Sequence, residues 1–369
     1  MSVSSKPSDN LLRMRRCCLA FAAGIVVLAG AASALRAQTT AAAACNVTTT
    51  ERVVAIGDVH GAHDQFVAIL RAAGLIDGRA RWSGGRAVLI QTGDILDRGK
   101  DSRKVIELLR RLERDAASAG GQVIALTGNH EFMRLAGDWR YVSPGEYDAF
   151  RDGASVELRD AVRARATAAA EERARAEKLP FDQGAFREQF LREVPLGLIE
   201  MRQAFAAGAP YGDWLRARPA VAKVNGIVFL HGGISDEVAS LGCDAINDSV
   251  AKDMKAAAGD PAQIASMFSA RETGPLWYRG LAQEPESAFA PTLGSILTRM
   301  GARAIVVGHT PTPGRISVRF GGRVVQIDTG MLDGAFFPGG VPAALLIEGQ
   351  AMTAVYLDRR EPLGAIPTS

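Results

Sequence analysis

The sequence lacks a strong excess of either charge. Its 43 lysines and arginines nearly balance its 40 aspartates and glutamates, which leaves a net charge of +3 on 369 residues. Much of this small surplus lies near the N-terminus, at Lys6, Arg13, Arg15 and Arg16. Nucleic-acid-binding proteins carry clustered lysines and arginines on one face, so we expect no nucleic-acid partner.

A fixed-period repeat and a strong compositional bias are also missing. Hydrophobic residues make up 47% of the chain and charged residues 22%, which excludes disordered and collagen-like proteins. We therefore expect a globular protein with a sizeable core. The length exceeds that of an average domain, but a single domain with an insert accounts for it.

Cysteines are few. Of the four in the chain, Cys17 and Cys18 lie in an N-terminal apolar run, which leaves Cys45 and Cys243. Two cysteines in an oxidising compartment are able to form a disulfide. The sequence does not give the separation and direction that a disulfide requires, so two unrelated, small buried residues remain the alternative.

Residues 1–37 have the features of an export signal. Arginines at 13–16 precede an apolar run over 17–28, and Ala32-Ser33-Ala34 is a small-residue cleavage pattern. We predict a signal peptide, a flexible linker over 38–50, and a periplasmic or secreted protein. The stretch from Cys17 to Leu35 is nearly long enough to span a membrane. An uncleaved anchor that holds the protein at the membrane is therefore the alternative.

Short apolar runs alternate with helical patterns after the linker. The runs at Arg52–Ile56, Ala87–Gln91 and Val123–Leu126 each end within two residues of a glycine and are typical of buried strands. Between them, Asp64–Ala73 and Ser102–Ala117 have helical periodicity. This order predicts an α/β fold with functional loops at the strand ends.

The domain is expected to span residues 51–360 and to contain a helical insert at about 141–218. This segment is rich in alanine, arginine and glutamate, with Glu171 and Arg175 four residues apart and Pro180 as a helix stop. The insert is either a cap that shapes access to the site or a solvated helical elaboration.

Hairpin patterns dominate the second half of the chain. The segments Val221–Leu230, Arg315–Ile327 and Ala343–Leu357 each contain a central turn, and two of the turns are Asn225-Gly226 and Gly321-Gly322. These segments predict a mostly antiparallel sheet.

Five short motifs place polar side chains in glycine-bounded loops after the expected strands. The glycines permit sharp turns and a close approach of the backbone. Four of the five histidines of the chain lie in these motifs. The motifs are GDVHG (57–61), GDILDRG (93–99), GNHE (128–131), HGG (231–233) and GHT (308–310).

Histidine, aspartate and asparagine together suit borderline cations such as Mn, Fe or Zn. Two such ions about 3.5 to 4 Å apart clamp a phosphoryl group and lower the pKa of a water, so that hydroxide becomes available as a nucleophile at neutral pH. The pattern therefore predicts two divalent or trivalent metal ions. The candidate ligands are Asp58, His60, Asp94, Asn129, His231 and His309.

The five motifs resemble those of the calcineurin-like metallophosphoesterases and, within them, the phosphoprotein phosphatase group. The similarity extends from residue 52 to about residue 332. The segments RYVSPGEY (140–147) and GPLWYRG (274–280) are most similar to the bacterial Shewanella-like protein phosphatases. The resemblance implies a central β-sandwich of mixed sheets flanked by helices.

The resemblance also implies a role for each candidate residue. Asp58 and His60 would bind the first metal, Asp94 would bridge both, and Asn129, His231 and His309 would complete the second. His130 would act as the general acid with Asp97 as its partner. Phosphate would be bound by Arg98 through its planar fork, with further contributions from Asn129 and Arg279.

The expected function is a dinuclear-metal phosphomonoesterase that uses metal-activated hydroxide and acts on phosphorylated Ser/Thr or Tyr of proteins or on small phosphoesters. The late motif is GHT rather than GHxH, and Pro311 stands where phosphodiesterase branches have a second histidine. QIDTGM (326–331) replaces a tyrosine-bearing motif of the Ser/Thr phosphatases. A nucleotide polyphosphate hydrolase that resembles the diadenosine tetraphosphatases is the alternative enzyme, and a non-catalytic metal-binding scaffold is the alternative outside enzymes.

Overall fold

The computed structural model describes residues 44–257, 261–312, 314–334 and 336–368. The expected signal peptide lies outside the described residues, as does the first part of the expected linker. The described chain divides into two compact units, residues 150–201 and the remainder. Within the described residues, no helix is long and apolar enough to cross a membrane.

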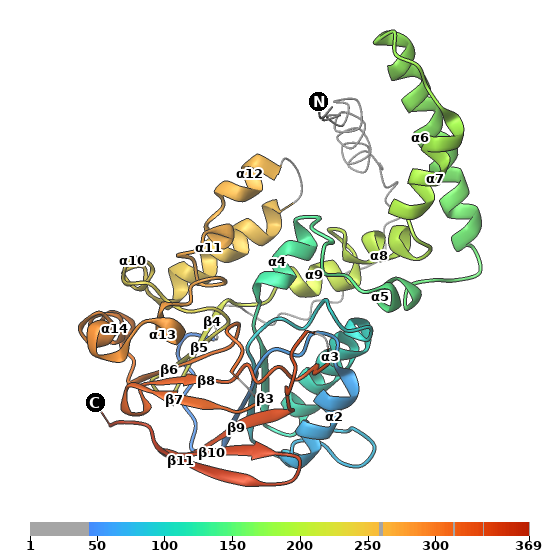
Figure 1. The fold of residues 1–369 in the computed structure, drawn as a ribbon. Helices are drawn as coiled ribbons and strands as arrows, with labels where there is room; N and C mark the ends of the chain where they lie inside the picture. Colours follow the sequence, from blue (N-terminus) through green and yellow to red (C-terminus); the bar gives the residue numbers. More distant parts are fainter. Residues whose placement is uncertain (1–43, 258–260, 313, 335, 369) are drawn as a thin grey trace, which may run out of the picture. The chain divides into compact units, whose positions relative to one another are not determined.

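The larger unit contains two mixed β-sheets (Figure 1). The strands of one sheet are β1 (Val53–Ile56), β2 (Val88–Gln91), β3 (Gln122–Ala125), β9 (Ala343–Glu348), β10 (Ala351–Tyr356) and β11 (Arg360–Ala365), in the order β11-β10-β9-β1-β2-β3. The strands of the other are β4 (Val221–Val224), β5 (Ile227–Leu230), β6 (Ala304–Val307), β7 (Ser317–Arg319) and β8 (Val324–Gln326), in the order β4-β5-β6-β8-β7.

The main core lies between the two sheets. Alternate residues of a strand point to opposite faces, and Val53 and Ala55 of β1 join Ile227 and Phe229 of β5 in one buried hydrophobic cluster. Strands β1, β2, β5 and β6 are buried along their whole length, as expected for strands that are covered on both faces. The predicted sandwich of mixed sheets is therefore confirmed.

Helices α2 and α3 lie on the side of the six-stranded sheet (Figure 1). The apolar stripe expected in α3 is buried, from Val105 to Leu112. The helices of the larger unit are α2 (His63–Ala72), α3 (Ser102–Ser118), α4 (Asn129–Leu135), α5 (Pro144–Asp148), α9 (Pro210–Arg216), α10 (Asp236–Ala239), α11 (Gly242–Ala256), α12 (Pro261–Ser266), α13 (Gly280–Gln283) and α14 (Glu286–Met300), with short 3-10 turns η3 (Phe268–Ala270) and η4 (Phe320–Gly322).

The second half of the chain does not form one sheet, and this expectation was wrong. The three hairpins are present, but β5 pairs with β6 and β6 with β8 in parallel. The last hairpin instead extends the first sheet, because β9 pairs antiparallel with β1, with Leu345 opposite Ala55. A hairpin pattern defines the local pair of strands and leaves its outer partner undetermined.

The smaller unit is helical. It contains α6 (Ser155–Ala176), α7 (Gln183–Glu193) and the start of α8 (Leu198–Phe205). Helix α7 buries Phe186 and Phe190, whereas Ser155 is the buried residue of the 22-residue α6. A helix that is polar all round is typical of a solvated element. The cap role of the insert stays a prediction, as do the domain boundaries.

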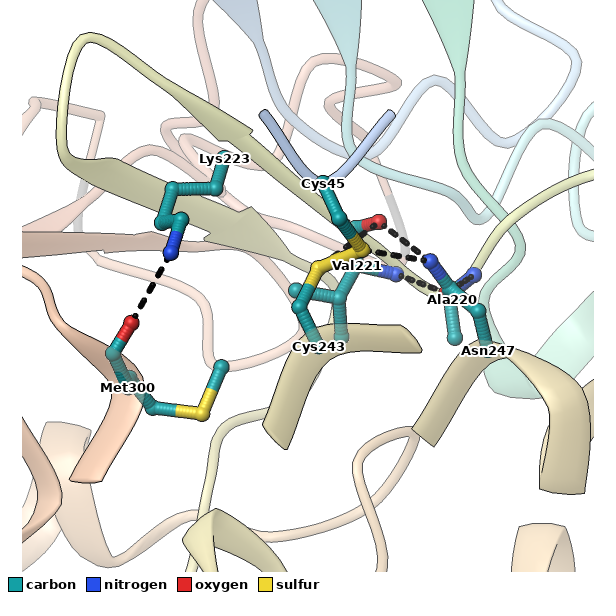
Figure 2. Close-up of a disulfide and its surroundings, with 7 residues drawn as sticks. All are labelled: Cys45, Ala220, Val221, Lys223, Cys243, Asn247 and Met300. Carbon is teal, nitrogen blue, oxygen red and sulfur yellow. Dashed lines mark hydrogen bonds between the residues drawn. A yellow bond between two sulfur atoms is a disulfide. The ribbon is translucent and has the colours of Figure 1, made fainter. Parts of the chain in front are cut away.

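Residues 44–49 are tied to the domain, so the expectation of a flexible linker is wrong for this part. Val47 forms a parallel bridge with Val224, and its N–H donates to Lys223 O at 3.0 Å. Cys45 and Cys243 form a disulfide, which joins this segment to the first turn of α11 (Figure 2). The disulfide alternative is therefore the one that the structure supports.

Candidate metal centre

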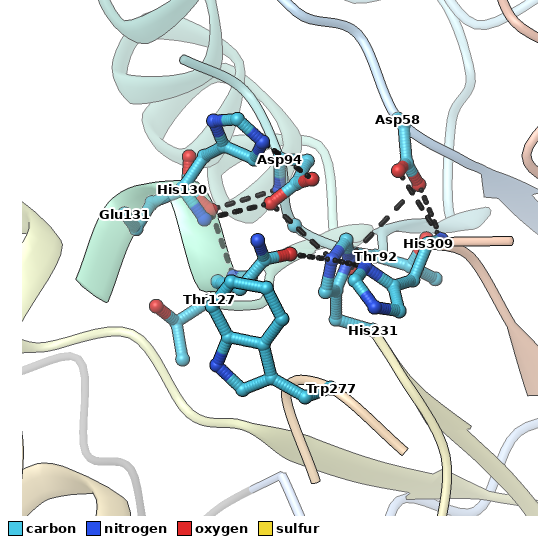
Figure 3. Close-up of polar contacts among 12 residues, drawn as sticks. Asp58, Thr92, Asp94, Thr127, His130, Glu131, His231, Trp277 and His309 are labelled. Carbon is cyan, nitrogen blue, oxygen red and sulfur yellow. Dashed lines mark hydrogen bonds and ion pairs between the residues drawn. The ribbon is translucent and has the colours of Figure 1, made fainter. Parts of the chain in front are cut away.

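The strand ends of both sheets carry the candidate residues. Strands β1, β2 and β3 run parallel, so the loops that follow them, with Asp58, Asp94 and Asn129, emerge at one edge. Strands β5 and β6 are also parallel and lead to His231 and His309. Ligand sites in α/β sheets form at the carboxyl ends of strands, and here the side chains from the loops converge (Figure 3).

The loops that carry these residues have unusual backbone conformations. His60, Asp94, Asp97, Arg98 and His309 all have positive φ angles, between 47° and 68°. Such angles are uncommon for residues other than glycine and persist where the surrounding structure enforces them, often at functional sites. The cluster of strained residues therefore marks this edge of the sheets independently of the side-chain chemistry.

Two motif glycines are required by the close approach of side chains. A Cβ atom on Gly128 would lie 2.3 Å from Asp94 Oδ1, and one on Gly308 would lie 2.4 Å from Asp58 Oδ1. Neither distance is sterically possible. These two positions allow the carboxylates of Asp58 and Asp94 to reach the centre of the site.

Asp94 lies at the centre of the candidate ligands. Its Oδ2 is 3.6 Å from His60 Nε2 and 3.8 Å from His130 Nε2, and its Oδ1 is 3.3 Å from His231 Nε2. Two groups with ligand geometry share this residue, one with His60 and His130 and the other with His231 and His309. A shared carboxylate between two groups is the arrangement that a bridged pair of metals requires.

The second group is tightly packed. His231 Nε2 lies 2.7 Å from Asn129 Oδ1 and 3.1 Å from His309 Nδ1. The backbone N–H of His309 donates to Asp58 Oδ1 at 3.0 Å. All six predicted ligands are therefore buried and lie together.

Burial controls the protonation of these ligands. Desolvation lowers the pKa of His60 to about 3 and that of His309 to about 2, and a neutral imidazole is the metal-binding form. His60 Nδ1 donates to the carbonyl of Leu96 at 2.9 Å, and His231 Nδ1 donates to that of Thr92 at 3.1 Å. A carbonyl only accepts, so each hydrogen bond places the proton on Nδ1 and leaves Nε2 available as a ligand.

The site fits a pair of cations. In each of the two groups that share Asp94, the ligand atoms lie within 4.8 Å of one another. Burial, together with the nearby Asp328 and Asp94, raises the pKa of Asp58 well above its ordinary value, because buried carboxylates repel one another. Positive charge between these groups would be bound by these atoms and would offset the repulsion.

His130 pairs with Asp97 as expected. Its Nδ1 is 2.7 Å from Asp97 Oδ2, so Nε2 faces the cluster. Burial lowers the pKa of His130, but Asp94 and Asp97 outweigh burial and the net shift is upward. The imidazole therefore retains its proton more readily than His60 does, although its position beside Asp94 also meets the geometric criterion for a ligand.

Both predicted arginines reach the cluster. Arg98 Nη1 is 3.2 Å from His60 Nε2 and Nη2 is 3.4 Å from His130 Nε2. The Arg98 guanidinium also lies against the rings of Tyr141 and Phe337, 5.5 and 4.9 Å from their centroids.

Arg279 donates to the carbonyl of His309 at 2.9 Å and to Thr310 Oγ1 at 3.0 Å. Burial lowers the pKa of Arg279, while the carboxylates of Asp58, Asp328 and Asp94 raise it. The two arginines are thus associated with different ligand histidines of the cluster.

Two buried acids at the site, Asp328 and Glu131, were not among the predicted site residues. Asp328 contacts Asp58, and burial raises its pKa to about 6. Glu131 accepts hydrogen bonds from the backbone N–H groups of Gly128, Asp94, Ile95 and Leu96, at 2.7 to 3.2 Å. Both acids have a local sequence feature that could have identified them, because Asp328 follows an apolar run and Glu131 is the last residue of GNHE. Their hydrogen-bond and charge partners, however, are mostly distant in sequence.

Comparisons with known proteins place the chain in a family. The calcineurin-like phosphoesterase family matches residues 51–313. Shewanella-like protein phosphatase 2 of Arabidopsis thaliana is 29% identical over 304 residues, which cover 80% of this chain and 75% of the relative. An uncharacterized protein of Schizosaccharomyces pombe is 30% identical over 288 residues, which cover 76% of this chain and 73% of the relative.

A solved structure has the same fold. It is the cold-active protein-tyrosine phosphatase of a psychrophile Shewanella species, with a TM-score of 0.64 and 28% sequence identity. The alignment covers 86% of this chain and 81% of that one. The chain therefore belongs to the calcineurin-like phosphoesterase family, is a hydrolase of phosphoesters, and is similar within the family to the Shewanella-like protein phosphatases.

Proposed function

We propose that the protein is a dinuclear-metal phosphomonoesterase that acts on phosphorylated proteins. The observation that carries this proposal is the position of Asp94 between two groups of buried ligands. Asp58 and His60 would hold one ion together with Asp94. Asn129, His231 and His309 would hold the second ion, again with Asp94.

The bound cations would supply charge for the phosphate oxygens and lower the pKa of a water. The remaining steps belong to the protein. Arg98 and Arg279 would bind and orient the phosphate from two sides, with Asn129 as a further contact. His130, oriented by Asp97, would donate its Nε2 proton to the leaving oxygen.

The surroundings of Arg98 favour an aryl phosphate, and hence phosphotyrosine, over an alkyl one. Tyr141 and Phe337 contact the guanidinium that would bind the phosphate, and Tyr141 is 40% exposed. Aromatic rings beside the phosphate site would contact the ring of a bound aryl ester. The name of the Shewanella neighbour, a protein-tyrosine phosphatase, agrees with this preference.

The donor set also guides the proposals for metal identity and location. Imidazole, carboxylate and amide ligands without a thiolate support Mn, Fe or Zn. The disulfide between Cys45 and Cys243 supports a periplasmic or secreted location, because disulfides persist in oxidising compartments.

A substrate panel tests the proposed function. The mature protein would be stripped with a chelator, reloaded with Mn, Fe or Zn, and assayed on para-nitrophenyl phosphate, on phosphotyrosine and phosphoserine peptides, and on diadenosine tetraphosphate. We expect turnover only with metal and fastest on the phosphotyrosine peptide. Preferential turnover of the dinucleotide would favour the alternative polyphosphate hydrolase, and no turnover of any ester would refute phosphatase function.

Variants connect this activity to the proposed site. Asp94→Asn removes the shared charge, so both ions should be lost together, measured as metal content per chain. Asp236→Asn is the matched control, because Asp236 is a surface acid of α10 that pairs with Ser295 and Arg299. Loss of one ion only in Asp94→Asn would contradict the shared-carboxylate assignment.

A further inference from the structure

A buried network lies behind the His130–Asp97 pair. Arg134, on α4, forms ion pairs with Asp97 and with Glu146 of α5, the latter at 2.7 Å. Ser102 Oγ donates to the other oxygen of Glu146, also at 2.7 Å. The side chains of Arg134, Asp97 and Glu146 are 0 to 1% exposed. The proposed roles of the metal ligands and of the phosphate-binding arginines do not use Arg134 or Glu146.

The geometry divides the two oxygens of Asp97 between two partners. Oδ2 faces His130 Nδ1, and Oδ1 accepts from Arg134 Nη2. Asp97 has a φ of 68°, so its backbone is in a strained conformation that needs support from its surroundings. Arg134 therefore fixes the rotation of the carboxylate that contacts His130.

Arg134 is itself held from several directions. Its guanidinium lies over the rings of Trp139 and Phe205, 5.4 and 5.0 Å from their centroids. The same Nη2 atom that contacts Asp97 also contacts Glu146. A planar guanidinium can direct the two hydrogens of one nitrogen to two carboxylates while its face lies on aromatic rings, whereas an ammonium group has no planar face to hold it there.

Glu146 has an electrostatic consequence for Asp97. A buried cation that faced Asp97 alone would cancel much of the negative charge that His130 contacts, because interactions are strong where water is excluded. Glu146 provides a second negative charge for the same guanidinium. Asp97 therefore keeps the charge with which it holds His130 in position.

We propose that Arg134 and Glu146 are positioning residues for the general acid, an inference that rests on the proposed function. In the step concerned, an oxygen from water bonds to phosphorus as the ester P–O bond breaks, and the proton that the water loses goes to solvent. The proton on His130 Nε2 moves to the leaving oxygen, which departs as an alcohol or phenol. His130 then takes a proton from solvent, and Asp97 keeps the ring oriented throughout.

A leaving-group series separates this role from a purely structural one. Proton donation matters most for esters whose leaving group is a weak acid. The assay compares nitrophenyl, phenyl and methylphenyl phosphates with the metal-loaded full chain. For Glu146→Gln we expect kcat to fall about tenfold more on methylphenyl than on nitrophenyl phosphate, a part of the roughly 100-fold or larger effect of a general acid, with KM unchanged.

The chain offers a matched control. Glu113 is a partly buried carboxylate that pairs with buried Arg218 and accepts from Trp214 Nε1 at 3.0 Å. Glu113→Gln thus removes a comparable charge away from His130, and its effect should be the same for every leaving group. Equal losses across the series in Glu146→Gln would overturn the proposal, and so would unchanged kinetics.

Two further variants keep the test decisive. Arg134→Lys retains the positive charge but not the planar guanidinium that lies over Trp139 and Phe205, and it should reproduce the dependence on the leaving group even if Glu146→Gln does not fold. In a His130→Asn background, Glu146→Gln should cause no additional dependence, because residues that act through one another are not additive. An additive effect would contradict the proposal. Absence of wild-type turnover would instead refute the proposed function.

Discussion

Glu131 provides a sensitive test of how the site is built. Its side chain is fully buried, and one oxygen accepts from the N–H groups of Ile95 and Leu96 while the other accepts from those of Asp94 and Gly128. Glu131→Gln replaces one acceptor oxygen with an NH2 group. Two buried backbone N–H groups then face a donor instead of an acceptor.

The magnitude follows from the number of hydrogen bonds lost. An unsatisfied buried donor costs about 1 to 3 kcal/mol, so two of them lower the free energy of unfolding of Glu131→Gln by about 2 to 6 kcal/mol. Because the loop that Glu131 holds carries Asp94, metal affinity should also fall, by roughly 10- to 100-fold as for other groups that orient ligands.

Urea denaturation of the metal-free protein measures the first effect, and metal titration measures the second. Glu286→Gln is the control, because Glu286 accepts a single backbone hydrogen bond, from Phe320 N at 2.9 Å, at an exposed position. It should change stability by less than about 0.5 kcal/mol. A loss of stability in Glu131→Gln no larger than in this control would refute the reasoning.

Three further predictions concern protonation, the disulfide and a motif glycine. Burial lowers the pKa of His60 and His309 below the ordinary 6.5, so each contributes stability to the chelated protein that is lost as pH falls below 6.5; His309→Gln should therefore lose less stability than the wild type between pH 7.5 and pH 5, and equal losses in the two proteins would contradict this. Cys243→Ser should lower the free energy of unfolding by about 2 to 5 kcal/mol, and the wild type should lose a similar amount in reductant. Gly128→Ala should abolish metal binding and turnover, whereas Gly78→Ala, with nothing within 4 Å of the added Cβ, should retain both; an active Gly128→Ala variant would refute the close-approach argument.

Local patterns in the sequence predicted much of the fold. The runs that became β1, β2 and β3 alternate with helical patterns, and this order predicted the α/β layer that these strands form, in which the structure pairs them in parallel. The hairpins were also predicted correctly, because a tight turn such as Asn225-Gly226 is encoded by a few adjacent residues. The allocation of β9 to the first sheet was missed, since backbone pairing with β1 joins residues far apart in sequence and leaves no local signal.

For the candidate site, the sequence by itself determined the chemical types and their glycine-bounded loops, because ligand identity and turn geometry are local properties. Their metal-binding roles stay predictions. Only the tertiary structure decided that Asp94 lies between two groups of ligands, that Cys45 reaches Cys243, and that a buried arginine links Asp97 to Glu146. The physical reason is that hydrogen bonds, ion pairs and disulfides depend on distance in space, and the packing of the two sheets sets those distances.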